Sequence, residues 1–387
     1  MNRQTIAIVA GEQSGDELGA AVMSALLERN PDIEFFGVGG DKMIALGLRS
    51  LFEQERLAVM GFVEPFKRLP DLLNAKKRVV TECLELRPDL FLGIDSPDFN
   101  LRISKALNKH KIKTAHYVSP SVWAWRQGRI KGIRKSIDLM LTLFPFEEAF
   151  YKEHQVRALC VGHPLADSLP IEMATNTELQ RMRSNLNLPM DSPIVTLMPG
   201  SRGGEVRMMG ELFLGVAHAC LKHTPNLHFI VPAANSDRMT QLSGMLAERG
   251  DTIQGRVHLI KQQSHQAMQV SDAVLLASGT STLEAMLLKK PMIVAYRLSS
   301  VTYAIVKHMV KTPYISLPNL IADEMLVPEF IQDDATVESL SQAVLTQLNE
   351  THQKTIQDRF TTMHRDLRLN SAALAADALL SLINNTP

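Results

Sequence analysis

Short apolar segments alternate with helical segments along almost the whole chain, and this alternation limits the fold more than any other feature. Two strands separated by a helix cannot form a hairpin, so they are expected to pair in a parallel sheet that the helices cover. The expected strands lie at residues 5–10, 35–40, 90–94, 114–118, 138–143 and 158–161, and in the second half at 194–198, 228–231, 258–259, 273–276 and 292–296. The pattern therefore predicts an α/β protein built on parallel sheets.

The length of 387 residues corresponds to about two domains. A Gly-His-Pro turn at 162–164 and a polar stretch at 176–184 mark the best linker, so we expect domains at residues 1–170 and 171–354. The last expected helix, at 351–382, has no strand after it. Residues from about 355 to 387 can therefore pack back on the first domain or on a partner subunit.

Composition narrows the class of protein. Lys plus Arg and Asp plus Glu both number 41, so nucleic acid is not an expected partner. The three cysteines are far apart, as in proteins of a reducing compartment, and the chain begins with a strand pattern instead of a secretory signal. No apolar run approaches the ~18 residues of a membrane span. We therefore expect a cytoplasmic protein whose contact with a membrane would be peripheral.

The stretch at 276–285 joins a buried strand to a helix through small residues. Backbone N–H groups at Ser278, Gly279 and Thr280 have no partner within the helix, and the helix dipole adds positive potential, which favours an anion. Glu284, in the first turns, can reach two neighbouring hydroxyls, as on a ribose. These features indicate a nucleotide site, although an ordinary Ser/Thr-capped crossover helix has the same pattern.

A second turn with similar chemistry follows the expected strand at 194–198. At 199–205 a glycine-rich backbone exposes N–H groups and Arg202 adds a planar cation, a combination that suits a pyrophosphate. Charge-assisted hydrogen bonds contribute about 1.5–3 kcal/mol each, more than the roughly 0.3–1 kcal/mol of a helix dipole, so Arg202 should dominate anion binding. A structural turn with an exposed arginine is the alternative.

Carboxylates follow two strands of the first domain. Asp95 and Asp98 come directly after the expected strand at 90–94, where open α/β sheets bind ligands. Capping of the next helix is the alternative role for both. The loop after the first strand carries Glu12 and Asp16 and lacks the G-x-G-x-x-G fingerprint, so it suits sugar hydroxyls better than phosphate. A plain helix cap is the alternative.

Two further stretches combine aromatic or apolar side chains with cations. Residues 119–135 hold both tryptophans and five cations, including Arg126 and Arg129, which favours a phosphate-bearing small ligand or a lipid headgroup over nucleic acid. A solvated helix face with the tryptophans in the core is the alternative. Residues 57–78 combine large apolar side chains with Lys and Arg, as on a lipid-facing surface. Domain core or a dimer contact beneath a solvated basic face fits the second stretch as well.

The sequence predicts neither a metal nor a cofactor. No D-x-D pair occurs, and the 12 histidines show no H-E-x-x-H or similar ligand spacing. Protein groups would therefore have to neutralise any departing diphosphate.

Six motifs give the chain a resemblance to a known family. They are Gly11-Glu-Gln-Ser-Gly-Asp16, Asp95-Ser-Pro-Asp-Phe-Asn100, Ser119-Pro-Ser-Val-Trp-Ala-Trp125, Pro199-Gly-Ser-Arg202, Ala277-Ser-Gly-Thr280 with Leu283-Glu284, and Ser316-Leu-Pro-Asn319. With these motifs in this order, the sequence closely resembles the lipid-A-disaccharide synthases over nearly its whole length. The match is poorest at 171–190, at Gly203-Gly204 and after residue 350, so no function is carried over to those positions.

The resemblance implies a GT-B glycosyltransferase, an α/β protein with two Rossmann-like parallel-sheet domains that face a cleft. The domain at 1–170 would bind the acceptor, 2,3-diacylglucosamine 1-phosphate, and the domain at 171–354 would bind the donor, UDP-2,3-diacylglucosamine. The product would be a β-1,6-linked disaccharide, a precursor of lipid A, formed with inversion and release of UDP.

The resemblance also assigns roles to residues. UDP would be held by Arg202, Ser278, Gly279, Thr280, Glu284 and Asn319. The acceptor sugar would lie near Glu12, Ser14 and Asp16, and its 1-phosphate near Arg126 and Arg129. Asp98 would remove the proton of the acceptor 6-hydroxyl, with Asp95 as the alternative base.

Both implied substrates carry acyl chains, so the enzyme would meet them at a bilayer surface. We therefore expect a peripheral protein on the cytoplasmic face of the inner membrane, with residues 57–78 as the docking surface. The terminal helix also allows a homodimer.

Overall fold

The computed structural model describes residues 4–57, 69–249, 251–299, 302–304 and 309–385. The chain forms two compact units. Unit 1 comprises Met1–Asp167, Met309–Lys311 and Leu367–Pro387, and unit 2 comprises Ser168–His308 and Thr312–Asp366.

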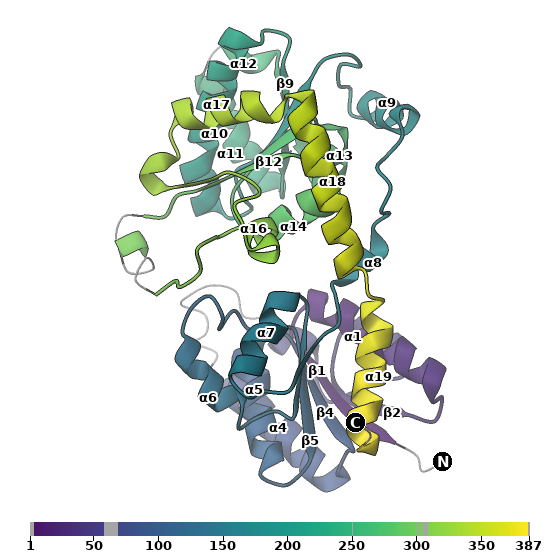
Figure 1. The fold of residues 1–387 in the computed structure, drawn as a ribbon. Helices are drawn as coiled ribbons and strands as arrows, with labels where there is room; N and C mark the ends of the chain where they lie inside the picture. Colours follow the sequence, from purple (N-terminus) through teal and green to yellow (C-terminus); the bar gives the residue numbers. More distant parts are fainter. Residues whose placement is uncertain (1–3, 58–68, 250, 300–301, 305–308, 386–387) are drawn as a thin grey trace. The chain divides into compact units, whose positions relative to one another are not determined.

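Unit 1 contains a seven-stranded parallel sheet with the strand order β3-β2-β1-β4-β5-β6-β7 (Figure 1). Its strands are β1 (Thr5–Ala10), β2 (Glu34–Val38), β3 (Arg49–Ser50), β4 (Leu90–Ile94), β5 (Lys113–Tyr117), β6 (Leu139–Thr142) and β7 (Ala158–Cys160). Its helices are α1 (Gln13–Arg29), α2 (Asp41–Ala45), α4 (Leu69–Leu86), α5 (Pro97–Asn108), α6 (Ile130–Ile133), α7 (Pro145–Glu153) and α19 (Ser371–Asn384), and α8 (Pro164–Ser168) runs into unit 2. Short 3-10 turns lie at Gln54–Arg56 and Gln127–Arg129.

The core of unit 1 follows from the period of two along each strand. Ile6 and Ile8 of β1 point into one apolar cluster, which α1 and α19 complete, whereas Ala7 and Val9 point into another on the opposite face. Because both faces are covered, the strands are apolar throughout and do not alternate with polar residues. The C-terminal helix α19 lies beside α1 (Figure 1), so the end of the chain completes the first unit.

Unit 2 repeats the design with a six-stranded sheet in the order β10-β9-β8-β11-β12-β13. Its strands are β8 (Ile194–Met198), β9 (His228–Ala233), β10 (Val257–Lys261), β11 (Ala273–Leu276), β12 (Met292–Tyr296) and β13 (Glu329–Ile331). Its helices are α9 (Asn176–Asn185), α10 (Gly203–His223), α11 (Ser236–Glu248), α12 (Asp251–Gln254), α13 (Ser264–Val270), α14 (Thr280–Leu287), α16 (Leu317–Ala322), α17 (Val337–Gln347) and α18 (Glu350–Leu367). A 3-10 turn lies at Gln332–Asp334.

Both sheets follow the doubly wound order, in which the first strand of each unit lies at the centre and the order reverses beside it. The reversal falls between β1 and β4 in unit 1 and between β8 and β11 in unit 2. The predicted α/β class with two Rossmann-like sheets is therefore confirmed.

Several local expectations are wrong. The two-residue β3 and the short β13 were not expected, because edge strands of this length carry little pattern. The two prolines at 313 and 318 indicate a segment at 312–319 without a regular helix, yet α16 begins at Leu317 and accommodates Pro318 in its first turn, where no N–H partner is needed. The single helix expected at 351–382 is two helices, since Asn370 adopts a φ of +58° before α19.

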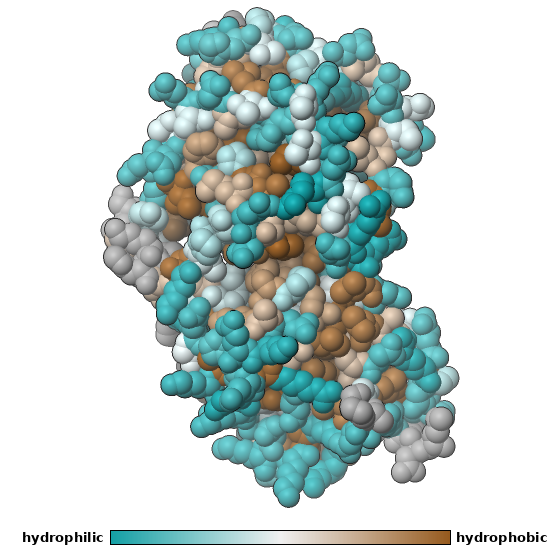
Figure 2. Space-filling view, viewed as in Figure 1, coloured by the Kyte–Doolittle hydropathy of each residue, from teal (hydrophilic) through white to brown (hydrophobic). Residues whose placement is uncertain are grey.

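The described residues contain no helix long and apolar enough to cross a membrane. Hydrophilic residues cover most of the face of each unit that Figure 2 displays.

Candidate active site

Most of the predicted UDP-binding residues meet at one pocket of unit 2. Strands β8 and β11 are neighbours at the point where the strand order reverses, which is where doubly wound sheets bind ligands. The loops that follow them line a cavity of about 570 Å³. Its wall includes Arg202, Ser278, Gly279, Thr280 and Glu284.

The turn that begins α14 is fixed by its own hydroxyls. Gly279 has a φ of +141°, which residues with side chains rarely adopt, and no atom lies within 4 Å of the place a Cβ would occupy. Ser278 Oγ donates to the Ile315 carbonyl at 3.1 Å, and Thr282 Oγ1 donates to the Gly279 carbonyl at 2.8 Å. Thr280 stands exposed in the first turn. The helix start therefore presents backbone to the cavity without a side chain at Gly279, as an anion site requires.

In the turn after β8, two of the backbone N–H groups that the sequence offered to an anion already have a partner within the protein. The N–H groups of Ser201 and Arg202 both donate to Glu205 Oε2 at 3.2 Å, so a carboxylate of the same helix engages donors that a phosphate would use. Gly200, with a φ of +111°, makes room for this contact, since a Cβ there would lie 2.7 Å from Glu205. The Arg202 side chain is 85% exposed and lies 3.3 Å from Glu205 Oε1. Arg202 thus remains an available cation beside the pocket.

Glu284 lies in the second turn of α14 with a side chain that is 22% exposed. Its Oε2 lies 3.5 Å from Nε2 of His265 in α13. This contact raises the pKa of His265, against the opposing effect of burial.

Sequence reasoning missed part of the pocket. Gln262, Gln263 and Ser264 follow β10 and line the cavity, and both glutamines have a φ of +60°. Tyr296, at the end of β12, lines it too, and burial raises the pKa of its phenol. All four follow strand ends, so the rule that ligands bind beyond the carboxyl ends of strands could have found them.

Asn319 lies beneath the pocket, fully buried, instead of on its wall. Its amide exchanges hydrogen bonds with the backbone of Val327 at 2.8 Å and donates to Glu329 Oε1 at 2.8 Å. Glu329 also accepts from Ser316, next to the Ile315 carbonyl that holds Ser278. The contacts give Asn319 a supporting position, and direct contact with UDP stays a prediction.

The corresponding point of unit 1 carries Asp95. It follows β4, the neighbour of β1, and adopts a φ of +49°, while Ser96 after it adopts +43°. Such angles are uncommon for residues with side chains, although Asp tolerates them better than most. Here the Asn100 side-chain N–H groups donate to the carbonyls of Ile94 and Asp95 at 3.2 and 2.8 Å. The strained turn therefore has a built-in clamp.

A buried histidine lies beside this clamp. A Cβ on Gly93 would meet Asn100 Cγ and His116 Nδ1, both at 3.0 Å, so the glycine lets the two side chains pack over it. Among the described residues, Asn100 Oδ1 and both ring nitrogens of His116 have no partner in hydrogen-bond geometry. Burial lowers the pKa of His116 to about 4, with the Val118 backbone acting in the opposite direction. The imidazole is therefore neutral near pH 7.

Asp98 and Arg129, predicted to serve different parts of the acceptor, contact each other. Arg129 donates to Asp98 Oδ1 at 2.6 Å, and the Asp98 side chain is 80% exposed. Arg126 stacks its guanidinium 4.6 Å from the centre of the Trp125 ring, with a φ of +53°. The structure thus brings Arg129 to the candidate base Asp98, whereas the contact of the Arg126 side chain is with Trp125.

The loop after β1 divides into two roles. Glu12 and Ser14 are exposed. Asp16 is buried, and its carboxylate accepts the backbone N–H groups of Gly40, Lys42 and Met43 at 2.9 to 3.1 Å. Those bonds cap α2, so the structure favours a structural role for Asp16, and a contact with the acceptor sugar stays a prediction.

Glu147, which sequence reasoning did not select, is a buried carboxylate beneath the Trp motif. It accepts from Trp123 Nε1 at 3.1 Å and from the backbone N–H groups of Leu143 and Phe144, each at 3.1 Å. Burial raises its pKa to about 7, although these donors oppose the shift. Nothing in a lone Glu signals this burial; the only local cue is its place three residues after the N-cap Phe144, from which its carboxylate accepts the Phe144 N–H.

The expected membrane-docking stretch at 57–78 lies mostly outside the described residues, which resume at Leu69. Of its described part, Leu57 and Ala75 belong to the core of unit 1 and Leu72 packs against it, whereas Leu73 is 50% exposed.

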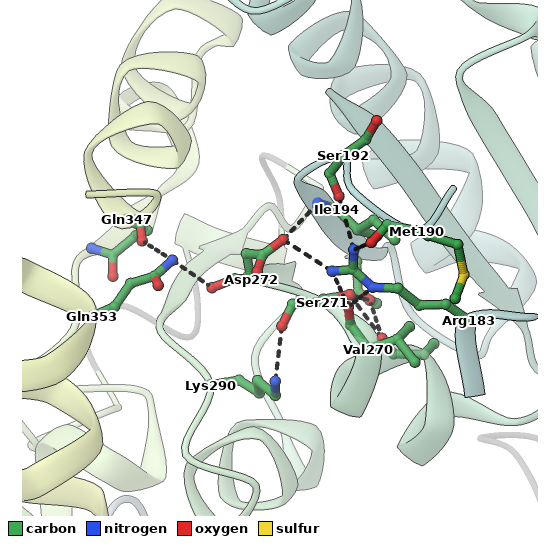
Figure 3. A network of polar contacts seen from close by, with 12 residues as sticks. Arg183, Met190, Ser192, Ile194, Val270, Ser271, Asp272, Lys290, Gln347 and Gln353 are labelled. Atoms are coloured by element: carbon green, nitrogen blue, oxygen red, sulfur yellow. Dashed lines mark hydrogen bonds and ion pairs between the residues drawn. The ribbon is translucent and has the colours of Figure 1, made fainter. Parts of the chain in front are cut away.

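A second cavity of unit 2, of about 480 Å³, is lined by residues between 170 and 182, by residues that precede β11 and β12, and by Gln353 and Gln357 of α18. It lies away from the carboxyl ends of the strands, where such sheets bind ligands. Figure 3 shows its polar network. Arg183 donates to the carbonyls of Met190, Ser192 and Val270, and Asp272 accepts from Arg183 and from the N–H of Ile194. These bonds fasten α9 to the sheet, which is a structural role. No group of three or more metal-ligand side chains occurs among the described residues.

Comparison with known proteins decides the family. The model of the lipid-A-disaccharide synthetase family matches residues 6–381. The chain belongs to this family. It is 51% identical over 379 residues to the lipid-A-disaccharide synthase of Cellvibrio japonicus, with 98% of this chain and 97% of that protein covered. It is 50% identical over 382 residues to that of Pseudomonas aeruginosa, with 98% of each covered.

The family membership confirms the resemblance and makes the protein a glycosyltransferase that forms the lipid A disaccharide from a UDP-sugar and a lipid acceptor. Solved structures agree on the GT-B fold. A glycosyltransferase from Rickettsia africae aligns with a TM-score of 0.62 at 14% identity, covering 100% of both chains. A Neisseria meningitidis UDP-GlcNAc 2-epimerase bound to UDP-GlcNAc aligns with a TM-score of 0.63 at 14% identity, covering 98% of this chain and 100% of that one.

Proposed function

We propose that the protein transfers 2,3-diacylglucosamine from its UDP derivative to the 6-hydroxyl of 2,3-diacylglucosamine 1-phosphate. The product is the β-1,6 disaccharide, formed with inversion at the anomeric carbon, and UDP leaves. The observation that carries this proposal is the pocket at the ends of β8 and β11, where an anion site, a cation and a carboxylate converge.

In this proposal unit 2 holds the donor. The diphosphate lies against the start of α14, where Gly279 leaves the backbone uncovered, and Arg202 swings from Glu205 to the phosphate. Glu284 accepts the ribose hydroxyls. Because Arg202 is mostly exposed, it reaches the ligand without breaking a buried contact.

Unit 1 holds the acceptor and supplies the base. The carboxylate of Asp98 takes the proton of the 6-hydroxyl as its oxygen bonds to the anomeric carbon and the bond to UDP breaks. Arg129 orients Asp98 and, with Arg126, faces the 1-phosphate. Asp95, held by Asn100, is the alternative base, and Glu12 and Ser14 contact sugar hydroxyls. The reaction requires the two sites to face each other across a cleft.

The acylated substrates place the reaction at a lipid surface. We infer a peripheral enzyme on the cytoplasmic face of the inner membrane that docks through residues 57–78, and a homodimer is compatible with this reading. The observation in favour is the exposed Leu73 at the basic end of that stretch.

The direct test is incubation with both labelled lipids, scored for disaccharide and for UDP, with and without a metal chelator. We expect acceptor-dependent release of UDP that the chelator does not abolish. Release of UDP without acceptor would favour a hydrolase or an epimerase, and loss of activity with the chelator would contradict neutralisation by protein groups.

A further inference from the structure

The proposed donor pocket carries an unfavourable charge for a diphosphate. Its charged wall residues are Arg202, Glu205 and Glu284, two carboxylates against one guanidinium. Arg202 lies 3.3 Å from Glu205, so the carboxylate of Glu284 has no cation on the wall to balance it. A nucleotide sugar brings two negative phosphates into this pocket, and each uncompensated carboxylate weakens binding through repulsion.

The compensating group is His265, which does not line the cavity but contacts Glu284, which does. Nε2 of His265 is 3.5 Å from Oε2 of Glu284, and the two side chains are 40% and 22% exposed. His265 enters from α13, which follows β10, while Glu284 enters from α14, which follows β11. The contact therefore joins two helices whose first turns both border the cavity.

We propose that His265 is a positioning residue for Glu284: its imidazolium fixes the carboxylate in the orientation that receives the ribose hydroxyls and offsets its charge, so the donor binds more tightly when His265 is protonated. This inference rests on the proposed donor site and concerns what sets the affinity of that site for the donor. His265 itself does not need to touch the nucleotide.

Several charged or titratable residues lie on the elements that pack around His265, but only Glu284 raises its pKa. Helix α13 packs on α9, which carries Glu178, Arg181 and Arg183, and on β9, which begins at His228. Lys261 ends the strand before it. The upward shift of the pKa of His265 comes from Glu284, first through the hydrogen bond and then through its charge.

The sign of the pH dependence follows from that shift. The pKa of His265 is raised from its ordinary value of 6.5, so the imidazolium is present below 6.5 and is lost as the pH rises through the raised value. Donor affinity should therefore be highest on the acid side and fall toward alkaline pH. Because the pair is partly exposed, the effect is that of a screened ion pair, about three- to fivefold in the dissociation constant.

The test is calorimetric titration of the full-length protein with UDP-N-acetylglucosamine, a soluble nucleotide sugar, from about pH 6 to about pH 8.5. Both phosphates of this probe are esterified, so their charge stays constant over the range. The slight ionisation of the uracil N–H at the alkaline end affects every variant alike, so the pH dependence that His265→Ala lacks belongs to His265. His265→Ala removes the cation, and His265→Arg keeps it at every pH. His223→Ala, at the exposed end of α10, is the matched control.

We expect the wild type and His223→Ala to lose about three- to fivefold in affinity between the two pH values. His265→Ala should bind at the weak level throughout, and His265→Arg should bind at the tight level throughout. A wild type with pH-independent affinity, or a His265→Ala variant that follows the wild-type curve, would overturn the inference while leaving the donor site intact. Failure of the wild type to bind the probe at any pH would overturn both.

Discussion

The burial of Glu147 makes a quantitative prediction about stability. Burial raises the pKa of Glu147 from its ordinary value of 4.5 to about 7 in the folded protein, so the folded state holds this proton over a pH range in which the unfolded state releases it. Stability must therefore fall as the pH rises from about 4.5 to about 7 and level off above that. At about 1.4 kcal/mol for each pKa unit, the loss amounts to about 3 kcal/mol.

Glu147→Gln replaces the ionisable carboxyl group with an amide of nearly the same shape, so the side chain no longer titrates. The variant gives up one good contact, because an amide cannot accept from Trp123 Nε1 at one end and from the N–H groups of Leu143 and Phe144 at the other, and this costs about 1–3 kcal/mol. At acid pH the wild type should therefore be the more stable protein. Near pH 8 the difference should shrink or reverse, since the wild type has lost its ~3 kcal/mol.

Differential scanning calorimetry across that pH range measures the effect. For a unit of this size about 3 kcal/mol corresponds to a change of about 6–12 °C in the difference between the two melting temperatures. Glu153→Gln, on the exposed face of the same helix, controls for the loss of one negative charge. Melting curves of wild type and Glu147→Gln that stay parallel from acid to alkaline pH would refute the reasoning, because they would mean that Glu147 ionises in the folded state as it does in the unfolded one.

Three further predictions concern the two sites. Arg202→Ala should weaken UDP binding by one to two decades, as about 1.5–3 kcal/mol implies, and an unchanged dissociation constant by calorimetry would argue against it. Asp98→Asn should keep UDP binding but lower turnover by about 10²–10⁴-fold in a coupled UDP-release assay; near-normal turnover would transfer the role of base to Asp95. Gly279→Ala should cost about 1–3 kcal/mol through backbone strain alone, because its φ is +141° with open space around it, whereas Gly244→Ala in the middle of α11 should be neutral or stabilising. Equal melting temperatures for these last two variants would contradict the strain argument.

The strand ends were the most predictable part of the molecule. Asp95, Arg202 and Ser278 could be placed from the sequence because each follows a short apolar run, and parallel strands bring their carboxyl ends to one edge of the sheet. The pairing order of the strands decides which of these ends become neighbours. That order depends on long-range packing, so only the structure could show that Arg202 and Ser278 line the same cavity.

The contacts of individual side chains were less predictable. Asp16 has the residue type and loop position of a sugar ligand, but three backbone N–H groups claim its carboxylate. Asn319 belongs to a motif that resembles a nucleotide pocket, yet its amide is spent on Val327 and Glu329. In both cases a buried polar group is satisfied by backbone far away in sequence, and no local pattern encodes such a partner.

The contact between Asp98 and Arg129 links the two halves of the proposed acceptor site. An arginine bonded to Oδ1 fixes the carboxylate and leaves its other oxygen to receive the hydroxyl proton. When the 1-phosphate of an acceptor draws Arg129 away, the carboxylate loses a positive neighbour and becomes a better proton acceptor. Binding of a complete acceptor would then activate the base that attacks with it, whereas an acceptor without the phosphate would leave Asp98 paired. If Asp98 is the base, as proposed, this pair would make turnover depend on the acceptor 1-phosphate.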